Sequence, residues 1–353
     1  MVTTQARYHP PSVTLLKVSQ IPKIRMKDLA KRAILASGVL RLISPGASAA
    51  ILMYHSVMPD PAAHADSLGG IIHSESEFRA QMELLARDYH PVSLDEVVDG
   101  LNGRKDLSSR SVVVTFDDGY TDNSEVAMPV LNRIGIAATF YVTVNSVEQR
   151  KLPWPSRLRF AFRKTKLRAW ADSRGNSWHL DDSDFRERAY LASCDDCCQF
   201  SGKVQEDFVC RIEEQLQAAV PGDLSSLIMS YDQIRSLVRH GHIVGSHTMT
   251  HPNMAYIPEQ DAKSELAESK QHLERELNET IRHFSYPCPA MTPHWNEKTV
   301  AQSRSVGYDS AVTTNGGLTQ GGDNPLSLKR IRPTKTAEGL RWNLECAFAG
   351  RAV

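Results

Sequence analysis

The segment from residue 111 to residue 142 constrains the fold more than any other part of this chain. It opens with Ser111–Phe116, a continuous β-branched run that is typical of a buried strand. A helical stretch at 127–134 ends at Gly135, and a second apolar run follows at 136–142. Strand, helix and strand in this order form a βαβ unit, so we expect a parallel sheet covered by helices.

Short apolar runs of the same kind recur on both sides of this unit. The apolar share of 41% is close to the globular average, so the chain can fill a full-sized core. About seven parallel strands are enough for an incomplete barrel of the α/β class. We predict strands centred on Ile51, Val112, Ala137, Ile243, Phe284, Ala311 and Leu328.

The rhythm of strands and helices divides the chain into three parts. We expect an irregular segment and an amphipathic helix in residues 1–48, the barrel in residues 49–340 and a C-terminal tail in residues 341–353. The rhythm is interrupted at about residues 148–229, which are rich in charges and tryptophan. We interpret this stretch as a mostly helical insertion in the barrel.

Charge and hydropathy limit the classes of partner and the compartment. The 41 basic and 41 acidic residues cancel, which argues against a nucleic-acid binder that works through net charge. No run approaches the roughly 20 apolar residues that cross a bilayer. The helix at 26–44 packs on the domain in one interpretation and contacts a membrane surface in the other. Our expectation is a cytoplasmic or membrane-peripheral protein, with export left open.

The six cysteines are too few for a disulfide framework in a chain of 353 residues. Three of them crowd together at Cys194, Cys197 and Cys198. The Cys-x-x-Cys spacing suggests half of a zinc site, but no second pair follows at the required distance. We interpret the cluster as an ordinary reduced surface segment, with a metal or redox role as the weaker alternative.

Two polar motifs follow predicted strands. Asp117 and Asp118 close the strand at 111–116, at the carboxyl end where α/β folds place their active sites. Adjacent side chains diverge on an extended or turning backbone, so the two carboxylates can serve different purposes. By itself, the motif could equally be a polar turn that closes a strand.

His247 and His251 also follow a predicted strand and are four residues apart, which can point both imidazoles the same way. Two histidines and one carboxylate form a familiar catalytic zinc set with an open position for water. The alternative for the pair by itself is two surface histidines. Together with the aspartate pair, the histidines predict a metal site.

At these motifs the chain resembles the NodB-homology polysaccharide deacetylases, the family-four carbohydrate esterases. Thr115–Gly119 and His247–His251 look like the first two motifs of that family in order and separation. The resemblance covers roughly residues 50–335 and implies a distorted (β/α)7 barrel. It implies that Asp117 is the catalytic base, and that Asp118, His247 and His251 bind the metal.

Two further segments resemble one branch of this family, which is linked to exopolysaccharide and biofilm-type polymers. Leu52–Val57 is similar to the opening of that branch, and so is the insertion that begins near Pro153-Trp154-Pro155.

The third family motif is altered in this chain. Ser285 stands where an arginine normally orients the catalytic aspartate, and Cys288 stands where a tyrosine offers its backbone N–H to the oxyanion. A backbone N–H does not depend on the side chain, so we expect Cys288 to serve. The orienting arginine must be replaced or absent.

The last family motif normally supplies a histidine as general acid, but residues 326–334 contain none. They offer Lys329, Arg330 and Arg332, and arginine is too basic to donate a proton usefully. His55 ends the first strand, which lies beside the last strand in a barrel, and imidazole titrates near neutral pH. We therefore predict His55 as the general acid, the alternative being a core histidine.

These inferences predict a hydrolase that removes acetyl groups from an N-acetylated, N-acetylglucosamine-type polysaccharide or oligosaccharide and releases acetate. The resemblance places it in exopolysaccharide or cell-envelope glycan biosynthesis, with the acetylated glycan and polysaccharide biosynthesis proteins as partners. The expected cofactor is a divalent metal, Zn²⁺ before Co²⁺, Fe²⁺ or Ni²⁺.

Three alternatives stay open. One is a cytosolic deacetylase of a lipid-linked or nucleotide-linked sugar intermediate. Another is a non-catalytic carbohydrate-binding member of the family, because the third and last motifs are altered. The last is a hydrolase of a different amide on the same barrel.

Overall fold

The computed structural model describes residues 26–42 and 46–352 of the chain, which divides into two compact units between Val39 and Leu40. The described part of the first unit is helix α1 (Met26–Ser37), which is shorter than the helix predicted at 26–44. A short 3-10 helix, η1 (Val39–Leu42), follows it. The irregular segment predicted at 1–25 lies outside the described residues. In the part of the chain that is described, no helix has the length and apolar character needed to cross a membrane.

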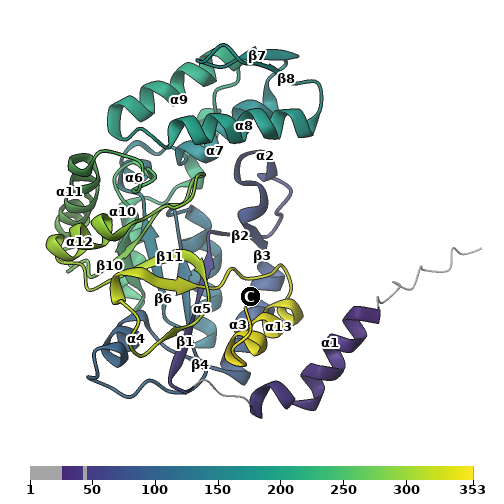
Figure 1. The fold of residues 1–353 in the computed structure, drawn as a ribbon, viewed down its shortest axis with the longest axis vertical. Helices are drawn as coiled ribbons and strands as arrows, with labels where there is room; N and C mark the ends of the chain where they lie inside the picture. Colours follow the sequence, from purple (N-terminus) through teal and green to yellow (C-terminus); the bar gives the residue numbers. More distant parts are fainter. Residues whose placement is uncertain (1–25, 43–45, 353) are drawn as a thin grey trace, which may run out of the picture. The chain divides into compact units, whose positions relative to one another are not determined.

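A parallel barrel forms the centre of the second unit (Figure 1). Within the described residues it has seven strands, each parallel to the next. Six predicted strand centres fall inside these strands, and Ala137 precedes its strand by one residue. In spatial order the strands are β1 (Ser48–Tyr54), β5 (Ser111–Phe116), β6 (Ala138–Val142), β9 (Ile243–Ser246), β10 (His283–Ser285), β11 (Ser310–Gly316) and β13 (Leu328–Arg330).

The barrel closes where the chain leaves β13 and meets β1. Ile331 forms a parallel bridge with Leu52: its N–H donates to the Ile51 carbonyl at 2.7 Å, and its carbonyl accepts from the Met53 N–H at 3.1 Å. Elsewhere the barrel is irregular, because β9 and β10 share a single registered pair and the register of β11 against β13 shifts. The predicted distorted (β/α)7 barrel is therefore confirmed.

The strands are buried on both faces, as their continuous apolar sequences require. Alternate side chains fill the barrel interior, where Ile51, Val113 and Tyr141 pack together with Val312 and Leu328. The other side chains of the strands face the surrounding helices and belong to the larger core. This alternation determines which residues at the carboxyl ends of the strands can enter the barrel.

Helices surround the barrel and close its amino end. Helix α4 (Leu94–Leu101) packs Leu94 and Val97 against Ala49 and Ile51 of β1, where the barrel begins. It starts with a capping box formed by Ser93 and Glu96. The other helices of the barrel are α3 (Glu75–Asp88), α5 (Met128–Ile134), α6 (Val144–Gln149), α10 (Tyr231–Arg239), α11 (Glu259–Leu277) and α12 (Glu297–Val306).

Short elements complete the barrel unit. Strands β2 and β3 form a parallel pair, β4 pairs with β5, and β12 pairs antiparallel with β1. Their bounds are β2 (Ser56–Met58), β3 (Ile72–Ser74), β4 (His90–Pro91) and β12 (Thr319–Gln320), with short helices α2 (Ala65–Leu68), η2 (Gly69–Ile71), η3 (Asn123–Ala127), η4 (Gly222–Leu227) and η5 (Pro325–Ser327).

The stretch predicted as a helical insertion contains three longer helices and a hairpin, gathered at one end of this unit (Figure 1). It has an apolar core of its own, in which Trp154, Phe162 and Trp170 pack with Val209 and Leu216. The elements are α7 (Trp154–Lys164), β7 (Ala169–Ala171), β8 (Ser177–His179), α8 (Ser183–Cys197) and α9 (Gly202–Leu216).

The cysteine cluster corrects one interpretation. Cys194, Cys197 and Cys198 were expected in a surface segment, but all three thiols are buried, and Cys194 and Cys197 pack in the insertion core. Burial raises the pKa of Cys194 and Cys197, which keeps these thiols protonated and unreactive. Among the described residues the cluster forms no group that could hold a metal ion.

The expected C-terminal tail at 341–353 is also corrected. Helix α13 (Ala337–Phe348) occupies most of it, and Leu340, Leu344 and Phe348 are buried in the main core. The Phe348 ring stacks on Tyr89 with 6.1 Å between the ring centroids. The end of the chain is therefore part of the folded barrel unit.

This packing predicts that Phe348→Ala destabilises the protein by about 3–5 kcal/mol, the usual cost of removing a buried aromatic side chain. Leu191→Ala is the control, because Leu191 is 49% exposed on α8; it should change stability by less than about 0.5 kcal/mol. Chemical denaturation measures both changes. Equal stability of the two variants would show that α13 does not belong to the cooperative core.

Candidate active site

Asp117 and Asp118 leave the carboxyl end of β5 in different directions. Strand alternation places Asp117 on the inward face with Val113 and Thr115. Asp118 has a left-handed backbone with a φ of +76°, and Gly119 follows with a φ of +82°. Such a conformation is costly for a residue other than glycine and persists only where the surroundings enforce it. The turn therefore separates the two carboxylates, as the sequence predicted.

His247 is oriented by hydrogen bonds from two neighbouring strands. It follows β9, and its backbone N–H donates to the carbonyl of Val142 at 2.9 Å. Its Nδ1 lies 2.7 Å from the carbonyl oxygen of Ser285 at the end of β10. Because a carbonyl can only accept, Nδ1 carries a proton, and Nε2 is the nitrogen that faces Asp118 and could bind a ligand once deprotonated. Burial lowers the pKa of His247, but the carboxylates of Asp117 and Asp118 outweigh it and raise the pKa.

The loop that carries His251 is held in a strained conformation. Thr248 and His251 both have a positive φ, of +68° and +60°. The Glu265 carboxylate on α11 accepts the N–H groups of Met249 and Thr250 at 2.8 and 2.9 Å. The backbone N–H of His251 donates to the Thr248 hydroxyl at 2.9 Å. These bonds fix the loop that turns the second imidazole toward Asp118.

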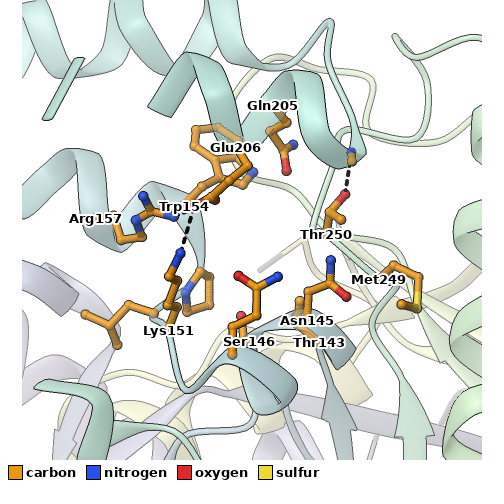
Figure 2. A pocket seen from close by; sticks show the side chains of 14 residues that line it. Thr143, Asn145, Ser146, Lys151, Trp154, Arg157, Gln205, Glu206, Met249 and Thr250 are labelled. Carbon is orange, nitrogen blue, oxygen red and sulfur yellow. Dashed lines mark hydrogen bonds and ion pairs between the residues drawn. The ribbon is translucent and has the colours of Figure 1, made fainter. Parts of the chain in front are cut away.

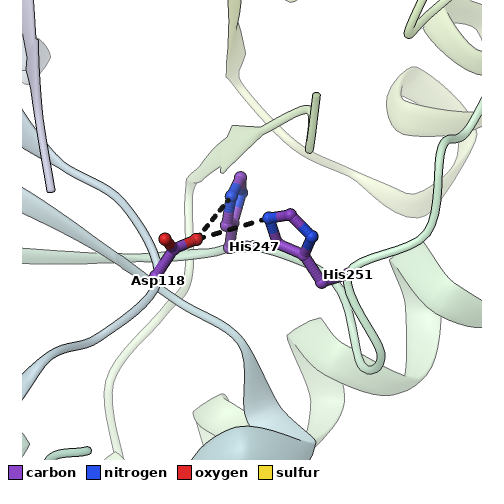
Figure 3. Close-up of side chains that lie close together, drawn as sticks. All are labelled: Asp118, His247 and His251. Atoms are coloured by element: carbon purple, nitrogen blue, oxygen red, sulfur yellow. Dashed lines mark ion pairs between the residues drawn. The ribbon is translucent and has the colours of Figure 1, made fainter. Parts of the chain in front are cut away.

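Asp118, His247 and His251 converge, as Figure 3 shows. Asp118 Oδ1 lies 3.5 Å from His247 Nε2 and 3.3 Å from His251 Nε2. Burial raises the pKa of Asp118, but the two facing imidazoles outweigh it and hold the pKa well below its usual value. The carboxylate is therefore ionised, yet its buried Oδ1 has no hydrogen-bond partner among the described residues.

This arrangement fits a divalent metal. The three side chains each offer one ligand atom, and these atoms lie within 4.8 Å of one another. Among the described residues no other group of three such side chains converges in this way. A cation between them would satisfy the buried Asp118 oxygen, and two imidazole nitrogens with one carboxylate suit Zn²⁺ and its first-row neighbours.

Arg330 on β13 supplies the arginine that the third motif lacks. Its Nη1 and Nη2 donate to the two carboxylate oxygens of Asp117 at 2.8 and 2.7 Å. The guanidinium is completely buried and also donates to the Ser285 hydroxyl at 3.2 Å and the Thr313 carbonyl at 2.8 Å. Ser285 therefore stands where an arginine was expected and accepts a hydrogen bond from the arginine that replaces it.

The ion pair between Asp117 and Arg330 determines the charge of Asp117. Burial raises the pKa of Asp117, but the positive charge of Arg330, with help from His247, holds the pKa below its usual value. Asp117 is therefore ionised and is fixed in one orientation by a two-point hydrogen bond.

His55 follows β1 and lines the same cavity as the aspartates. Burial lowers the pKa of His55, although Asp118 and Asp117 oppose this effect. Its backbone carbonyl accepts from Asn123 Nδ2 at 2.7 Å, and the Asp122 carboxylate accepts from the following Ser56 hydroxyl at 2.6 Å. The segment after the Asp-Asp-Gly turn thus fixes the position of His55, which is neutral near pH 7.

Cys288 also lines this cavity, and its backbone N–H has no hydrogen-bond partner among the described residues. The cavity has a volume of about 210 Å³. Besides the aspartates and histidines, it is lined by residues of three regions. These are Ser67, Leu68, Gly70 and Ile71 from the α2–η2 segment, Pro153, Pro155, Ser156, Arg159 and Tyr190 from the insertion, and Met53, Tyr120, Pro289, Thr314 and Arg332 from the barrel.

The insertion also contacts the loop that carries His251. The indole N–H of Trp154 donates to the His251 carbonyl at 2.9 Å. A second, polar pocket lies on this side, between the insertion and the ends of the barrel strands (Figure 2). In it, Lys151 pairs with Glu206 at 3.1 Å, and the Gly202 N–H donates to Thr250 Oγ1 at 3.1 Å.

Every residue predicted for the site lines one cavity: Asp117, Asp118, His247, His251, His55 and Cys288. Sequence reasoning did not place Arg330, Trp154 or Glu265 in the site. A buried strand that carries one arginine at an inward position was the available indication for Arg330. Pro153-Trp154-Pro155 was noted as the start of the insertion, but no pattern marked Trp154 or Glu265 as a residue of the site, because their partners depend on how the insertion and α11 pack.

Comparisons with known proteins identify the family to which the chain belongs. The family model for polysaccharide deacetylases matches residues 104–177 and 208–311, half of the chain, and skips residues 178–207, which include all of α8. The protein YxkH of Bacillus subtilis, named as a polysaccharide deacetylase, is 23% identical over 290 residues, which are 82% of this chain and 72% of YxkH.

Solved structures share the fold. The deacetylase PplD of Streptococcus pyogenes, solved with acetate, has 20% identity and a TM-score of 0.57 over 84% of this chain and 98% of its own. IcaB of Ammonifex degensii has 21% identity and a TM-score of 0.55 over 85% and 97%. The BpsB deacetylase domain of Bordetella bronchiseptica has 15% identity and a TM-score of 0.51 over 82% and 97%. With its motifs in place on the matching barrel, the chain belongs to the polysaccharide deacetylase family and is a hydrolase of N-acetyl amide bonds.

Proposed function

We propose that the protein removes acetyl groups from an N-acetylglucosamine-type glycan by metal-dependent hydrolysis, in exopolysaccharide or cell-envelope glycan biosynthesis. The observation that carries the proposal is the convergence of Asp118, His247 and His251 beside the ionised Asp117 in one cavity. The similarity of residues 52–57 and of the insertion to the exopolysaccharide branch supports the choice of pathway.

The metal ligands in this proposal are Asp118, His247 and His251, with Zn²⁺ as the first choice and Co²⁺, Fe²⁺ or Ni²⁺ as others that suit the ligand set. A divalent cation held there would polarise the acetyl carbonyl and lower the pKa of water. His247 is prepared for this task because its Nδ1–H is already committed to Ser285.

Asp117 is the general base in this mechanism. It takes a proton from the attacking water, which adds to the acetyl carbonyl carbon. Arg330 does not touch the substrate; it keeps Asp117 ionised and aimed into the cavity. It is therefore a positioning residue.

Residues on other walls of the cavity stabilise the oxyanion and deliver a proton to the leaving nitrogen. The free backbone N–H of Cys288 donates to the oxyanion of the tetrahedral intermediate. His55 passes the proton that Asp117 took from water to the sugar nitrogen as the C–N bond breaks. The products are acetate and a glucosamine-type amine, which is cationic at neutral pH.

A deacetylase of a lipid-linked or nucleotide-linked sugar would use the same residues, so it remains a second candidate. The non-catalytic alternative was motivated partly by the missing arginine, and Arg330 removes that reason. The membrane-surface role of the N-terminal helix, the cytoplasmic location and the biosynthetic partners remain predictions.

The proposed activity predicts acetate release from N-acetylglucosamine oligomers by the purified protein. Release should stop with a chelator and return with Zn²⁺. Asp117→Asn should lower kcat by roughly 10²–10⁴-fold, because the base is lost, while the bound metal stays. Asp118→Asn should lose the metal as well. Enzymatic determination of acetate and elemental analysis of the purified variants give both readouts.

Two results would count against this assignment. Release that continues undiminished after complete removal of metal would exclude metal-dependent hydrolysis. Loss of metal in Asp117→Asn, with retention in Asp118→Asn, would reverse the roles of the two carboxylates.

Replacement of Arg330 should move the acid limb of the pH–rate profile. The folded-state pKa of Asp117 is depressed, so activity that needs the carboxylate falls as pH drops through that pKa. Arg330→Met removes the charge that lowers it, so the limb moves to higher pH. Arg330→Lys keeps a charge and should move the limb less, at a reduced kcat.

The stability of the Arg330→Met protein provides a second readout. An unpaired buried carboxylate costs about 3–5 kcal/mol, so Arg330→Met should also be less stable at neutral pH, where Asp117 is charged. An unchanged acid limb in a folded Arg330→Met protein would show that Asp117 is not the group that titrates.

Trp154→Phe should weaken metal binding by roughly tenfold, because the His251 loop loses its indole donor. Trp170→Phe is the matched control: Trp170 lies in the same core and donates to Gln215 instead, at 2.9 Å. Competition with a chelator measures the affinity of each variant. Equal affinities would show that the insertion does not support the metal site.

A further inference from the structure

Two arginines line the catalytic cavity without belonging to the catalytic group. Arg332 lies just beyond Ile331, where the barrel closes, and Arg159 lies on α7 of the insertion. The barrel and the insertion thus each contribute one guanidinium to the wall of the same cavity. The proposed deacetylation gives neither of them a role.

The guanidinium of Arg332 has no counter-ion in the part of the chain that the structure describes. The side chain is exposed, and it forms no hydrogen bond or ion pair with any residue that the structure describes. Its charged neighbour is another cation, Lys335. Lys335 Nζ is used in donating to the carbonyls of Gly70 and Ile72, at 2.6 and 2.5 Å, in the segment that forms another wall of the cavity. No carboxylate of the described residues therefore forms an ion pair with Arg332 or Lys335.

Arg159 is only partly neutralised. Its Nη1 pairs with Glu187 at 3.0 Å, but Glu187 is shared with Arg163 at 2.9 Å. Its Nε is buried and has no hydrogen-bond partner among the described residues. The guanidinium carbon also lies 5.5 Å from the centroid of the Tyr190 ring, which lines the cavity. The side chain is thus held in place with one donor unused.

The α2–η2 segment approaches Arg159 at Gly69. A Cβ atom at Gly69 would lie 2.5 Å from Arg159 Nε. The φ of Gly69 is +59°, a backbone conformation that favours glycine. The α2–η2 segment therefore packs directly against this guanidinium at the edge of the cavity.

Arg159 and Arg332 line the cavity away from the paired Asp117, and Arg163 and Lys335 lie next to them outside the lining, so this wall carries a net positive charge. Arg159, Arg163, Arg332 and Lys335 are cations, and Glu187 is the single carboxylate that pairs with any of them among the described residues. A low-dielectric wall, here Leu68 and Ile71, strengthens the field of such a group on a ligand. A cavity of this kind attracts an anion.

We propose that the cavity binds an anionic group of the substrate next to the reacting acetamido sugar, with Arg332 as its direct contact and Arg159 as a supporting charge. The planar guanidinium fork matches a carboxylate or a phosphate. The ligand is therefore a glycan that carries either the carboxylate of a neighbouring uronic acid or the phosphate of a sugar phosphate. This inference rests on the proposed deacetylation, because it assigns the substrate class of that site.

The test compares acetate release by the metal-loaded enzyme from three substrates. They are a neutral N-acetylglucosamine tetramer, a tetramer in which N-acetylglucosamine alternates with glucuronic acid, and N-acetylglucosamine 1-phosphate. One anionic substrate should have a lower KM than the neutral tetramer, and high salt should reduce the difference. The substrate with the advantage identifies the source of the anion.

Arg332→Ala should raise the KM of the preferred anionic substrate by roughly tenfold or more, the value of a hydrogen bond between charged groups. The kcat and the KM of the neutral tetramer should change little. Lys329→Ala is the matched control, because it removes the same charge from an exposed residue of β13 that does not line the cavity. It should leave all three KM values unchanged.

Equal KM values for neutral and anionic substrates would overturn the inference, and so would an Arg332→Ala variant that retains the full preference. Calorimetry separates this failure from failure of the proposed function. If no substrate releases acetate, the deacetylation proposal fails. In that case calorimetry still tests the anion site. Binding of the uronic-acid tetramer or the sugar phosphate that is weakened by Arg332→Ala and not by Lys329→Ala would support it. Equal binding of these ligands by the two variants would exclude it.

Discussion

The ion pair between Asp117 and Arg330 is the interaction on which the rest of the site depends. It lies inside the barrel and joins the carboxyl end of β5 to that of β13, strands separated by most of the barrel unit in sequence. A buried ion pair is favourable only when its remaining donors and acceptors are satisfied. Here the guanidinium also reaches Ser285 and Thr313, so β10 and β11 take part. The pair keeps the carboxylate of Asp117, the proposed general base, charged although burial raises its pKa.

The proposed metal site is held in place by other contacts. Asp118, Thr248 and His251 all have left-handed backbones, and each of these costs folding energy that the surrounding structure must offset. Glu265 on α11 and Trp154 on α7 hold the histidine loop from two directions. The insertion therefore has a structural purpose in the site as well as forming part of its wall. The barrel unit carries the residues of the proposed site, and the insertion holds the loop of one of them, His251, through Trp154.

Sequence patterns predicted the parts of this protein that rely on local chemistry. Continuous β-branched runs marked the strands, and polar motifs at their carboxyl ends marked Asp117 and His247. The Arg330 partner was not predicted, because a contact across 213 residues depends on how the barrel closes at Ile331. Helix α13 was also missed, although the sequence contains the information. Its apolar residues Leu340, Leu344 and Phe348 recur at helical spacing, and the prediction of a tail overlooked this pattern.

The surroundings of His55 constrain how a proton can move through the proposed mechanism. Burial lowers the pKa of His55, so the imidazole is neutral near pH 7 and cannot begin the cycle as a proton donor. Asp117 begins ionised and acquires a proton when water attacks, which removes one of the two negative charges that face His55. The departing nitrogen needs a proton when the C–N bond breaks, and Asp117 holds one at that stage. A relay in which that proton passes to the amine by way of His55 balances the charges at each step, and it leaves both residues ready for the next substrate.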